Sequence, residues 1–242
     1  MKTAICTLLD DSFVVGFKAF IKSLLKWHPG IDYNFVIIDC GLSDKSKLEM
    51  SFYYSNLFFV EPEYKNYSGI PMHKTDERLQ KTYYTLEAFN LDYDRVIFFD
   101  MDMIVTGDIS EILNCTADFA AVKGYNAKLD EFRDDINSGM FVVGKKYLNK
   151  QTYKELLRIA QRGFSMPDQK VLNIFFKDKI SYFNKKYNVE KRMIETKKYK
   201  NVISDIRILH FIAGKPWQDV PVDDKKFIPY YRIWKEYYDG KN

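Results

Sequence analysis

Hydrophobic residues in the first hundred positions alternate between continuous runs and helical spacing, and this pattern predicts an α/β fold. The apolar run at residues 3–9 predicts a buried strand. From Phe13, apolar residues recur every three or four positions, as in a helix that ends at Pro29 and Gly30. Further strands are expected at 35–39, 57–60 and 95–99, with helices at 46–52 and 75–89. Because strands and helices alternate, the sheet is expected to be parallel in this half.

The second half of the chain continues the pattern with shorter signals. Strands are expected at 119–122, 139–143 and 207–212, and helices at 152–161 and from Pro167. With 242 residues and no internal repeat, the chain is long enough to bury one substantial core. We expect one α/β domain over residues 1–220, with a mixed, mainly parallel sheet flanked by helices. An aromatic and basic helical extension is expected at 221–242.

Composition and charge narrow the class of protein. The chain is 46% hydrophobic and 29% charged, as in a folded protein, and its net charge of +4 favours phosphate-bearing partners without requiring nucleic acid. Its three cysteines form no metal-binding spacing and no disulfide framework, which suits a reducing compartment. The first apolar run is too short for a signal peptide or a membrane span. We therefore expect a cytoplasmic protein that does not bind nucleic acid.

Two later stretches are rich in basic residues. Residues 185–200 carry more basic than acidic side chains, and residues 227–238 mix aromatic residues with Arg232 and Lys235. A solvated face followed by a helix packed on the body explains both stretches. The alternative is peripheral attachment to an anionic membrane or acceptor through the C-terminal segment, because basic residues interleaved with Trp and Tyr suit an interface.

Candidate chemistry centres on Asp100 and Asp102, which follow the apolar strand at 95–99. Open α/β sheets bind ligands at the carboxyl ends of their strands, and two carboxylates there form a site suited to Mg²⁺ or Mn²⁺. Without a cation, neighbouring carboxylates repel each other. A turn or a helix cap is the alternative, but the preceding strand is too apolar for a surface turn. Asp108 and Ser110 already offer caps for the next turn.

A second candidate group begins at His210, which lies in the expected strand at 207–212 and is followed by Gly214 and Lys215. A lone histidine there is either a core imidazole or a ligand. The glycine and lysine favour a phosphate site, because glycine lets backbone amides approach an anion and lysine supplies a point charge.

Small polar residues stand at two further element starts. The run Asn137, Ser138 and Gly139 precedes the apolar strand residues at 140–143, either as a simple turn or as hydrogen-bonding groups for sugar hydroxyls. Asp168 and Gln169 follow Pro167 at a helix start, where the helix dipole alone stabilises an acid.

In their order along the chain, these motifs resemble the glycogenin-like family 8 glycosyltransferases, and the resemblance covers nearly the whole sequence. The matching residues are Thr7 and Leu8, the Asp100 to Asp102 motif, the run from Asn137, the pair at Asp168, and the segment from His210 to Trp217. The resemblance implies a GT-A, Rossmann-like fold with a nucleotide-binding half at 1–110 and a sugar and acceptor half at 111–220. It also implies that Mn²⁺ or Mg²⁺ supports transfer of a hexose, with retention of configuration, from a UDP-sugar to a glycan or glycoprotein hydroxyl.

The resemblance also implies residue roles. Asp100, Asp102 and His210 would hold the metal, and the catalytic residues would be Asp168, Gln169 and Lys215. The donor would be bordered by Thr7, Leu8, Asp11, Phe13, Lys81, Asp100, Met101, Asp102, Asn137, Ser138, Gly139, Gly214 and Lys215. Two spacings depart from the family. Its glycine and lysine usually follow the histidine by three and six residues, whereas Gly214 and Lys215 follow His210 by four and five, and Lys81 lies farther from Asp100 than the family's basic residue.

Two other functions fit part of the pattern. A haloacid-dehalogenase-like phosphatase also has an apolar strand ending in two spaced aspartates. That family, however, places the motif near the N-terminus and has Thr or Val where this chain has Ile104. A non-catalytic module that binds nucleotide sugars would keep the same residues without turnover, although the intact metal and lysine candidates argue against it.

Overall fold

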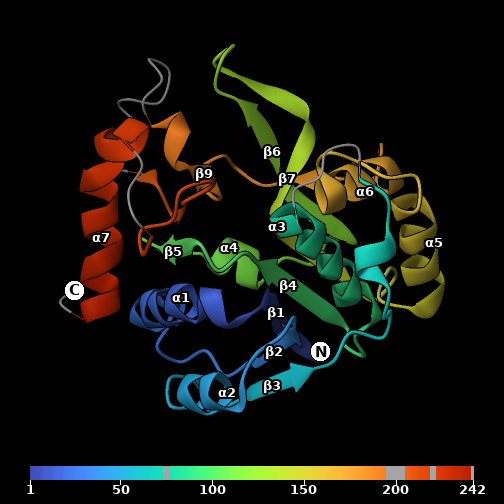
Figure 1. The fold of residues 1–242 in the computed structure, drawn as a ribbon, viewed down its shortest axis with the longest axis horizontal. Helices are drawn as coiled ribbons and strands as arrows, with labels where there is room; N and C mark the ends of the chain where they lie inside the picture. Colours follow the sequence, from blue (N-terminus) through green and yellow to red (C-terminus); the bar gives the residue numbers. More distant parts are fainter. Residues whose placement is uncertain (73–76, 195–204, 219–221, 241–242) are drawn as a thin grey trace.

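The computed structural model describes residues 1–72, 77–194, 205–218 and 222–240, and within them a seven-stranded sheet has the order β3-β2-β1-β4-β7-β6-β8. Helices cover both faces of this sheet (Figure 1). Its parallel part consists of β1 (Thr3–Leu9), β2 (Asn34–Asp39), β3 (Leu57–Val60) and β4 (Arg95–Phe99). The mixed, mainly parallel sheet with flanking helices confirms the expected fold class.

The inner parallel strands β1, β2 and β4 are mainly apolar because helices bury both of their faces, whereas the edge strand β3 leaves Phe58 and Val60 exposed. One face packs on α1 (Val14–Trp27), where the rings of Phe20 and Phe99 lie 5.2 Å apart. The other face packs on the 3-10 helix η3 (Lys81–Asn90), on α5 (Lys150–Ala160) and on α6 (Pro167–Phe175). The shorter helices are α2 (Asp44–Ser51), α4 (Ser110–Leu113), η1 (Asp11–Phe13), η2 (Tyr67–Gly69), η4 (Lys191–Met193) and η6 (Val222–Phe227).

The segment before β4 differs from the single helix expected at 75–89. It consists of α3 (Glu77–Gln80) and then η3, while Thr75 and Asp76 lie outside the described residues. Buried Glu87 on η3 accepts hydrogen bonds from the hydroxyl groups of Tyr67 (2.9 Å) and Tyr153 (2.6 Å). These bonds tie η3 to η2 and to α5.

The second half of the sheet contains both antiparallel and parallel pairs, and its two main strands are longer than expected. Strand β7 (Glu131–Gly144) pairs with β4 on one side and with β6 (Phe119–Asn126) on the other, and β6 also pairs with the short β8 (Ser181–Tyr182). The expectation that Asn137, Ser138 and Gly139 precede the strand is wrong, because all three lie within β7. The polar first half of β7 lacks an apolar run, and the β6–β7 pairing carries two register shifts.

A small sheet brings distant segments to the end of β4. It has the order β5-β10-β9 among the described residues and consists of β5 (Met103–Val105), β10 (Ile208–His210) and β9 (Val189–Glu190). Strand β10 ends at His210, two residues earlier than expected, and pairs His210 with Met103. Neither β5 nor β9 was expected, since strands of two or three residues are too short to show a period.

The C-terminal helix α7 (Ile228–Asp239) packs along α1, in agreement with the helix expected there (Figure 1). Trp27 Nε1 donates to the Tyr237 hydroxyl at 3.2 Å, and Lys22 Nζ donates to the Tyr238 carbonyl at 2.5 Å. The aromatic side chains of α7 that face the body are buried, namely Tyr231, Trp234 and Tyr237. In the described part of the chain, no helix is both long and apolar enough to cross a membrane.

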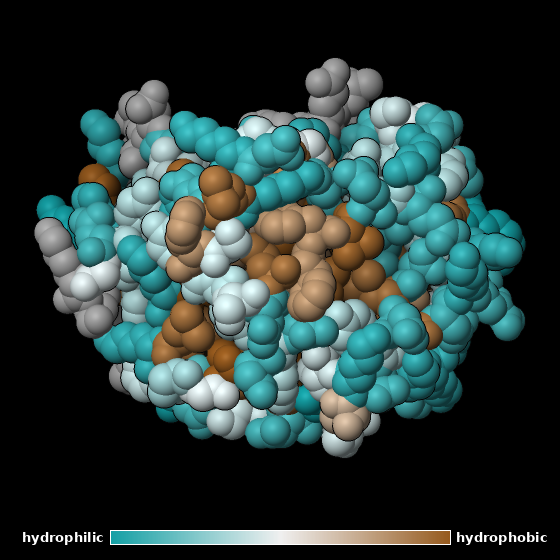
Figure 2. All heavy atoms as spheres, turned by 90° about the horizontal axis from the view of Figure 1, so that it is seen from below, coloured by the Kyte–Doolittle hydropathy of each residue, from teal (hydrophilic) through white to brown (hydrophobic). Residues whose placement is uncertain are grey.

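The β3 edge of the large sheet carries exposed apolar side chains. Phe58 on β3 is 49% exposed, and Phe52, which follows α2, is 80% exposed. Figure 2 views the molecule from below the orientation of Figure 1 and shows apolar residues gathered in the middle of that face, surrounded by hydrophilic ones.

Candidate active site

Asp100 and Asp102 lie where the chain passes from the large sheet into the small one. Asp100 follows β4 directly, and Asp102 precedes β5. The Asp100 amide donates to the Gly139 carbonyl at 2.8 Å, and the Phe211 amide donates to the Asp102 carbonyl at 2.8 Å. Backbone bonds to β7 and to the residue after β10 therefore hold this short turn on both sides.

The turn places both carboxylates beside His210. Nε2 of His210 lies 3.0 Å from Asp102 Oδ1 and 3.7 Å from Asp100 Oδ2. Ligand atoms of the three residues all lie within 4.8 Å of one another, so this cluster could hold a metal ion. Lys215 adds a positive charge to the cluster, because its ammonium group pairs with Asp102 Oδ2. The structure thus brings together residues that are about 110 positions apart in the sequence.

Gly139 gives the cluster the room it needs. A Cβ atom at this position would lie 2.6 Å from His210 Cε1 and 2.8 Å from Asp100 Oδ2. Both distances are shorter than van der Waals contact, so any side chain here would push the imidazole or the carboxylate away. The cluster therefore requires a glycine at this position of β7.

The cluster shifts the pKa values of its members in opposite directions. Burial and the neighbouring charge of Asp102 raise the pKa of Asp100 to about 7. Burial also opposes ionisation of Asp102, but His210 and Lys215 outweigh it and hold its pKa well below the usual range. The carboxylate of Asp102 likewise outweighs burial at His210 and raises the pKa of the imidazole.

A buried polar chain orients the imidazole. His210 Nδ1 lies 2.7 Å from Asn188 Oδ1, and Asn188 Nδ2 donates to Asn137 Oδ1 at 2.9 Å. Asn137 Nδ2 in turn donates to Glu190 Oε1 at 3.0 Å. Sequence reasoning missed Asn188 and Glu190, which belong to or adjoin the short strand β9. Asn188 has a φ of 57°, a left-handed conformation that Asn tolerates better than most residues, but this preference alone does not mark a site.

Asp168 and Gln169 begin α6 and are both buried. Thr82 and Ser138 favour the ionised form of the Asp168 carboxylate, but burial outweighs them and raises its pKa. Asp168 is close enough to Asp100 for its charge to raise the pKa of that residue too. Asp168 therefore lies near the cluster of Asp100, Asp102 and His210.

The residues predicted to border the nucleotide lie near the carboxyl end of β1, in η1 and at the start of η3. Thr7 is buried in β1, and its Oγ1 has no hydrogen-bond partner among the residues that the structure describes. Leu8 is half-buried in the same strand, and the Asp11 carboxylate accepts a hydrogen bond from the Ser43 amide at 2.9 Å. Lys81 pairs with Asp10 Oδ2 at 2.6 Å, and sequence reasoning missed Asp10 although it follows a buried strand as Asp100 does.

Aromatic packing joins this region to the loop after His210. The ring of Phe13 lies 5.6 Å from the ring of Trp217 in an edge-to-face arrangement, and Lys215 Nζ lies 5.6 Å from the centre of the Phe13 ring. At Gly16 on α1, a Cβ atom would lie 2.2 Å from the Met101 carbonyl oxygen. Helix α1 thus packs closely on the aspartate turn, whose middle residue Met101 is buried.

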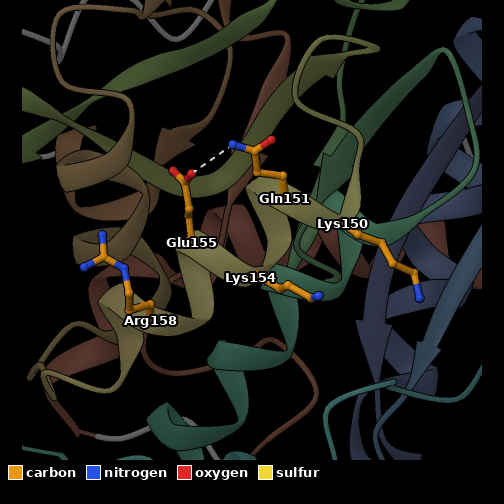
Figure 3. A pocket seen from close by; sticks show the side chains of 5 residues that line it. All are labelled: Lys150, Gln151, Lys154, Glu155 and Arg158. Atoms are coloured by element: carbon orange, nitrogen blue, oxygen red, sulfur yellow. Dashed lines mark hydrogen bonds between the residues drawn. The ribbon is translucent and has the colours of Figure 1, made fainter.

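A separate surface pocket lies along α5 (Figure 3). It is lined by Lys150, Gln151, Lys154, Glu155 and Arg158. None of the residues predicted for catalysis or binding lines this pocket.

Comparison with known proteins assigns the family. Residues 4–220 match Glycosyl transferase family 8. The chain belongs to this family. The match covers the aspartate turn, His210 and Lys215, and it does not favour the phosphatase alternative.

Relatives of this glycosyltransferase include proteins of similar and of greater length. Uncharacterized protein R707 of Acanthamoeba polyphaga mimivirus is 20% identical over 81% of this chain and 79% of its own length. Glycosyltransferases GlyF and GlyE of Streptococcus pneumoniae are 23% and 26% identical over 78% and 60% of this chain. The matched regions span only 49% of GlyF and 37% of GlyE.

Solved structures agree on the GT-A fold. The galactosyltransferase LgtC, crystallised with donor and acceptor sugar analogs, superposes with a TM-score of 0.73 at 18% identity, over 98% of this chain and 95% of that one. GlyE superposes with a TM-score of 0.71 at 19% identity, over 98% of this chain and 60% of that one. At these identities the likeness establishes the fold.

Proposed function

We propose that this family 8 glycosyltransferase uses a divalent metal to move a hexose from a UDP-sugar to a glycan or protein hydroxyl with retention of configuration. The observation that carries the proposal is the cluster of Asp100, Asp102 and His210 with Lys215 at its side. A nucleoside diphosphate carries several negative charges, and a metal site next to a lysine is suited to hold such a group.

The donor atoms of the cluster fit a divalent metal. Two carboxylates and one imidazole nitrogen suit Mn²⁺, and Mg²⁺ accepts similar oxygen ligands. The bond of Asn188 to His210 Nδ1 leaves Nε2 directed at the carboxylates, as a metal-binding histidine requires. When bound, the cation would supply positive charge to the departing diphosphate.

Lys215 is proposed to assist the same leaving group. Its ammonium pairs with Asp102 in this structure and lies at the Phe13 ring, between the metal cluster and the nucleotide side. The ammonium can therefore donate a hydrogen bond to a phosphate oxygen near the metal. Gly214, immediately before it, is proposed to let the backbone approach the diphosphate. Lys81, paired with Asp10, is proposed to add positive charge at the nucleotide side.

Retention allows two routes, and Asp168 has a role in both. In the first, a carboxylate oxygen of Asp168 bonds to the anomeric carbon as the bond between that carbon and the diphosphate oxygen breaks and UDP leaves. The acceptor hydroxyl then displaces Asp168 and passes its proton to the departed diphosphate. In the second, the acceptor attacks from the face that UDP leaves, and Asp168 and Gln169 hold the sugar. The position of buried Asp168 beside Ser138 and the metal cluster supports either role.

The remaining site residues are proposed to bind the donor. Thr7, Leu8, Asp11 and Phe13 would border uridine, and Asn137, Ser138, Gly139 and Gln169 would surround the sugar. Residues 1–110 would then form the nucleotide half, residues 111–220 the sugar and acceptor half, and residues 221–242 a C-terminal extension. A cytoplasmic location with peripheral membrane contact through that extension is part of the same proposal.

A panel of UDP-hexoses tests this function. With Mn²⁺ present, released UDP should accumulate with at least one donor, and an acceptor glycan should increase the rate. Donor binding without release of UDP would instead indicate the non-catalytic nucleotide-sugar-binding module. Absence of both binding and turnover across the panel would refute the donor class.

A further inference from the structure

Lys191 is a buried lysine outside the residues assigned to the reaction so far. It begins η4 directly after β9 and is only 2% exposed. It belongs to the basic stretch interpreted from sequence as a solvated face, and for Lys191 that interpretation is wrong. Burying an ammonium group costs folding free energy unless polar atoms surround it, so the hydrogen-bond partners of Lys191 indicate what the residue does.

The partners of Lys191 join the loop after His210 to the C-terminal helix. Its Nζ donates to the Gly214 carbonyl at 2.7 Å and to the Tyr231 hydroxyl at 2.7 Å. The Tyr231 hydroxyl itself donates to the Gly214 carbonyl at 3.3 Å. The rings of Phe227 and Tyr231 lie 5.0 and 5.1 Å from the ammonium. One carbonyl oxygen thus receives hydrogen bonds from β9–η4 and from α7.

The loop that carries this carbonyl is short and strained. Ala213 has a φ of 63°, in the left-handed region that favours glycine. Gly214 follows it, and Lys215 reaches from the next position to Asp102. Because the peptide bond is planar, holding the Gly214 carbonyl also sets the direction of the Lys215 amide.

We propose that Lys191 and Tyr231 hold the Gly214 carbonyl and so position the loop after His210 for the donor diphosphate. This pair of hydrogen-bond donors is called the clasp below. Both are positioning residues, because they act through Gly214 and Lys215. The inference rests on the proposed function, since it assigns the loop to the diphosphate of a UDP-sugar. It also makes α7 a support of the donor site, and not only a C-terminal extension packed on the domain.

Binding of UDP and of uridine separates this role from a general effect on folding. Tyr231→Phe removes one hydroxyl, and it should weaken UDP binding about threefold to tenfold, the loss typical of one hydrogen bond. Lys191→Met should weaken UDP binding by about tenfold or more. Uridine lacks the diphosphate, so its affinity should stay unchanged, as should the affinity for Mn²⁺ alone, measured by electron paramagnetic resonance.

Tyr237→Phe is the matched control, because Tyr237 lies on the same helix with equal burial but accepts from Trp27. It should leave UDP affinity unchanged. Unchanged UDP affinity in Tyr231→Phe, or equal losses for UDP and uridine, would overturn the clasp alone when the wild-type protein binds UDP. Should Lys191→Met fail to fold, the Tyr231→Phe comparison still decides. A wild-type protein that binds no UDP overturns the clasp and the proposed function together.

Discussion

His210 Nδ1 lies 2.7 Å from Asn188 Oδ1, and this contact identifies the imidazole nitrogen that faces the two aspartates. Asn188 uses its Nδ2 to donate to Asn137, so its Oδ1 must be the acceptor for the histidine. His210 Nδ1 therefore carries the hydrogen, and Nε2 is the nitrogen directed at Asp100 and Asp102.

Removing the amide of Asn188 should weaken metal binding without removing a ligand. In Asn188→Ala the imidazole loses the bond that holds its orientation, and Mn²⁺ affinity should fall by roughly 10- to 100-fold, as for other residues that support metal ligands. Electron paramagnetic resonance of free Mn²⁺ measures it. Asn184→Ala is the control, since among the described residues the Asn184 side chain bonds only to the nearby Lys186 amide. Equal Mn²⁺ affinity in both variants would contradict this role of Asn188.

Gly139→Ala should disturb the cluster through space alone. The added methyl would lie 2.6 Å from His210 Cε1, so the imidazole or β7 must shift, at a cost of about 1 to 3 kcal/mol in the free energy of unfolding. Mn²⁺ affinity should fall as well. Urea denaturation measures the first effect, with Gly30→Ala as control because a Cβ there meets no atom within 4 Å. Wild-type stability and Mn²⁺ affinity in Gly139→Ala would show that the site tolerates the methyl group.

Asp168→Asn should reduce turnover by roughly 10²-fold or more if the carboxylate bonds to the sugar. The amide keeps the size and shape of the buried side chain, so the protein should stay folded. Release of UDP from the donor that the wild-type protein accepts measures the effect. A wild-type rate in the variant would remove Asp168 as the nucleophile.

Asp39, at the end of β2, should make stability depend on pH. Although burial opposes ionisation, bonds from the Leu42 and Gly41 amides and from Lys47 lower its pKa below 3.8. A carboxyl group with a lowered folded-state pKa stabilises the fold above the unfolded-state pKa, and this contribution is lost as pH falls through the folded-state value.

The matched variant is Asp39→Asn, which should cost about 1 to 2 kcal/mol in the free energy of unfolding at pH 7 and progressively less below pH 3.8. Urea denaturation at several pH values measures the difference from wild type. Asp92→Asn, whose exposed carboxylate pairs at 3.6 Å with Lys2, should change stability little at any pH. A difference for Asp39→Asn that is constant with pH would refute the ionic contribution.

The sequence was most informative where one hydrophobic pattern extended over a whole element. Strands β1 to β4 are continuous apolar runs, so the acids that follow β4 could be placed at a sheet edge before the structure was known. The polar start of β7 and the two- or three-residue strands β5 and β9 show no such hydrophobic pattern, so they were missed. These short strands are what bring His210 and Asn188 to the aspartates.

Contacts between distant segments limited the site prediction in the same way. Lys191 finds its partners 23 and 40 positions later in the chain, at Gly214 and Tyr231. In the sequence it is one lysine of a basic stretch, and only tertiary packing distinguishes it from the exposed Lys185 and Arg192. The motif residues His210 and Lys215 were predictable because a known family shares their order.

Metal-dependent release of UDP tests the central claim most directly. With the donor accepted by the wild-type protein, the rate should be high in Mn²⁺, fall to background in excess chelator and return when Mn²⁺ is restored. Asp102→Ala should stay at background in Mn²⁺ while its circular dichroism matches that of the wild type. Full activity in excess chelator, or in Asp102→Ala, would contradict the proposed metal site.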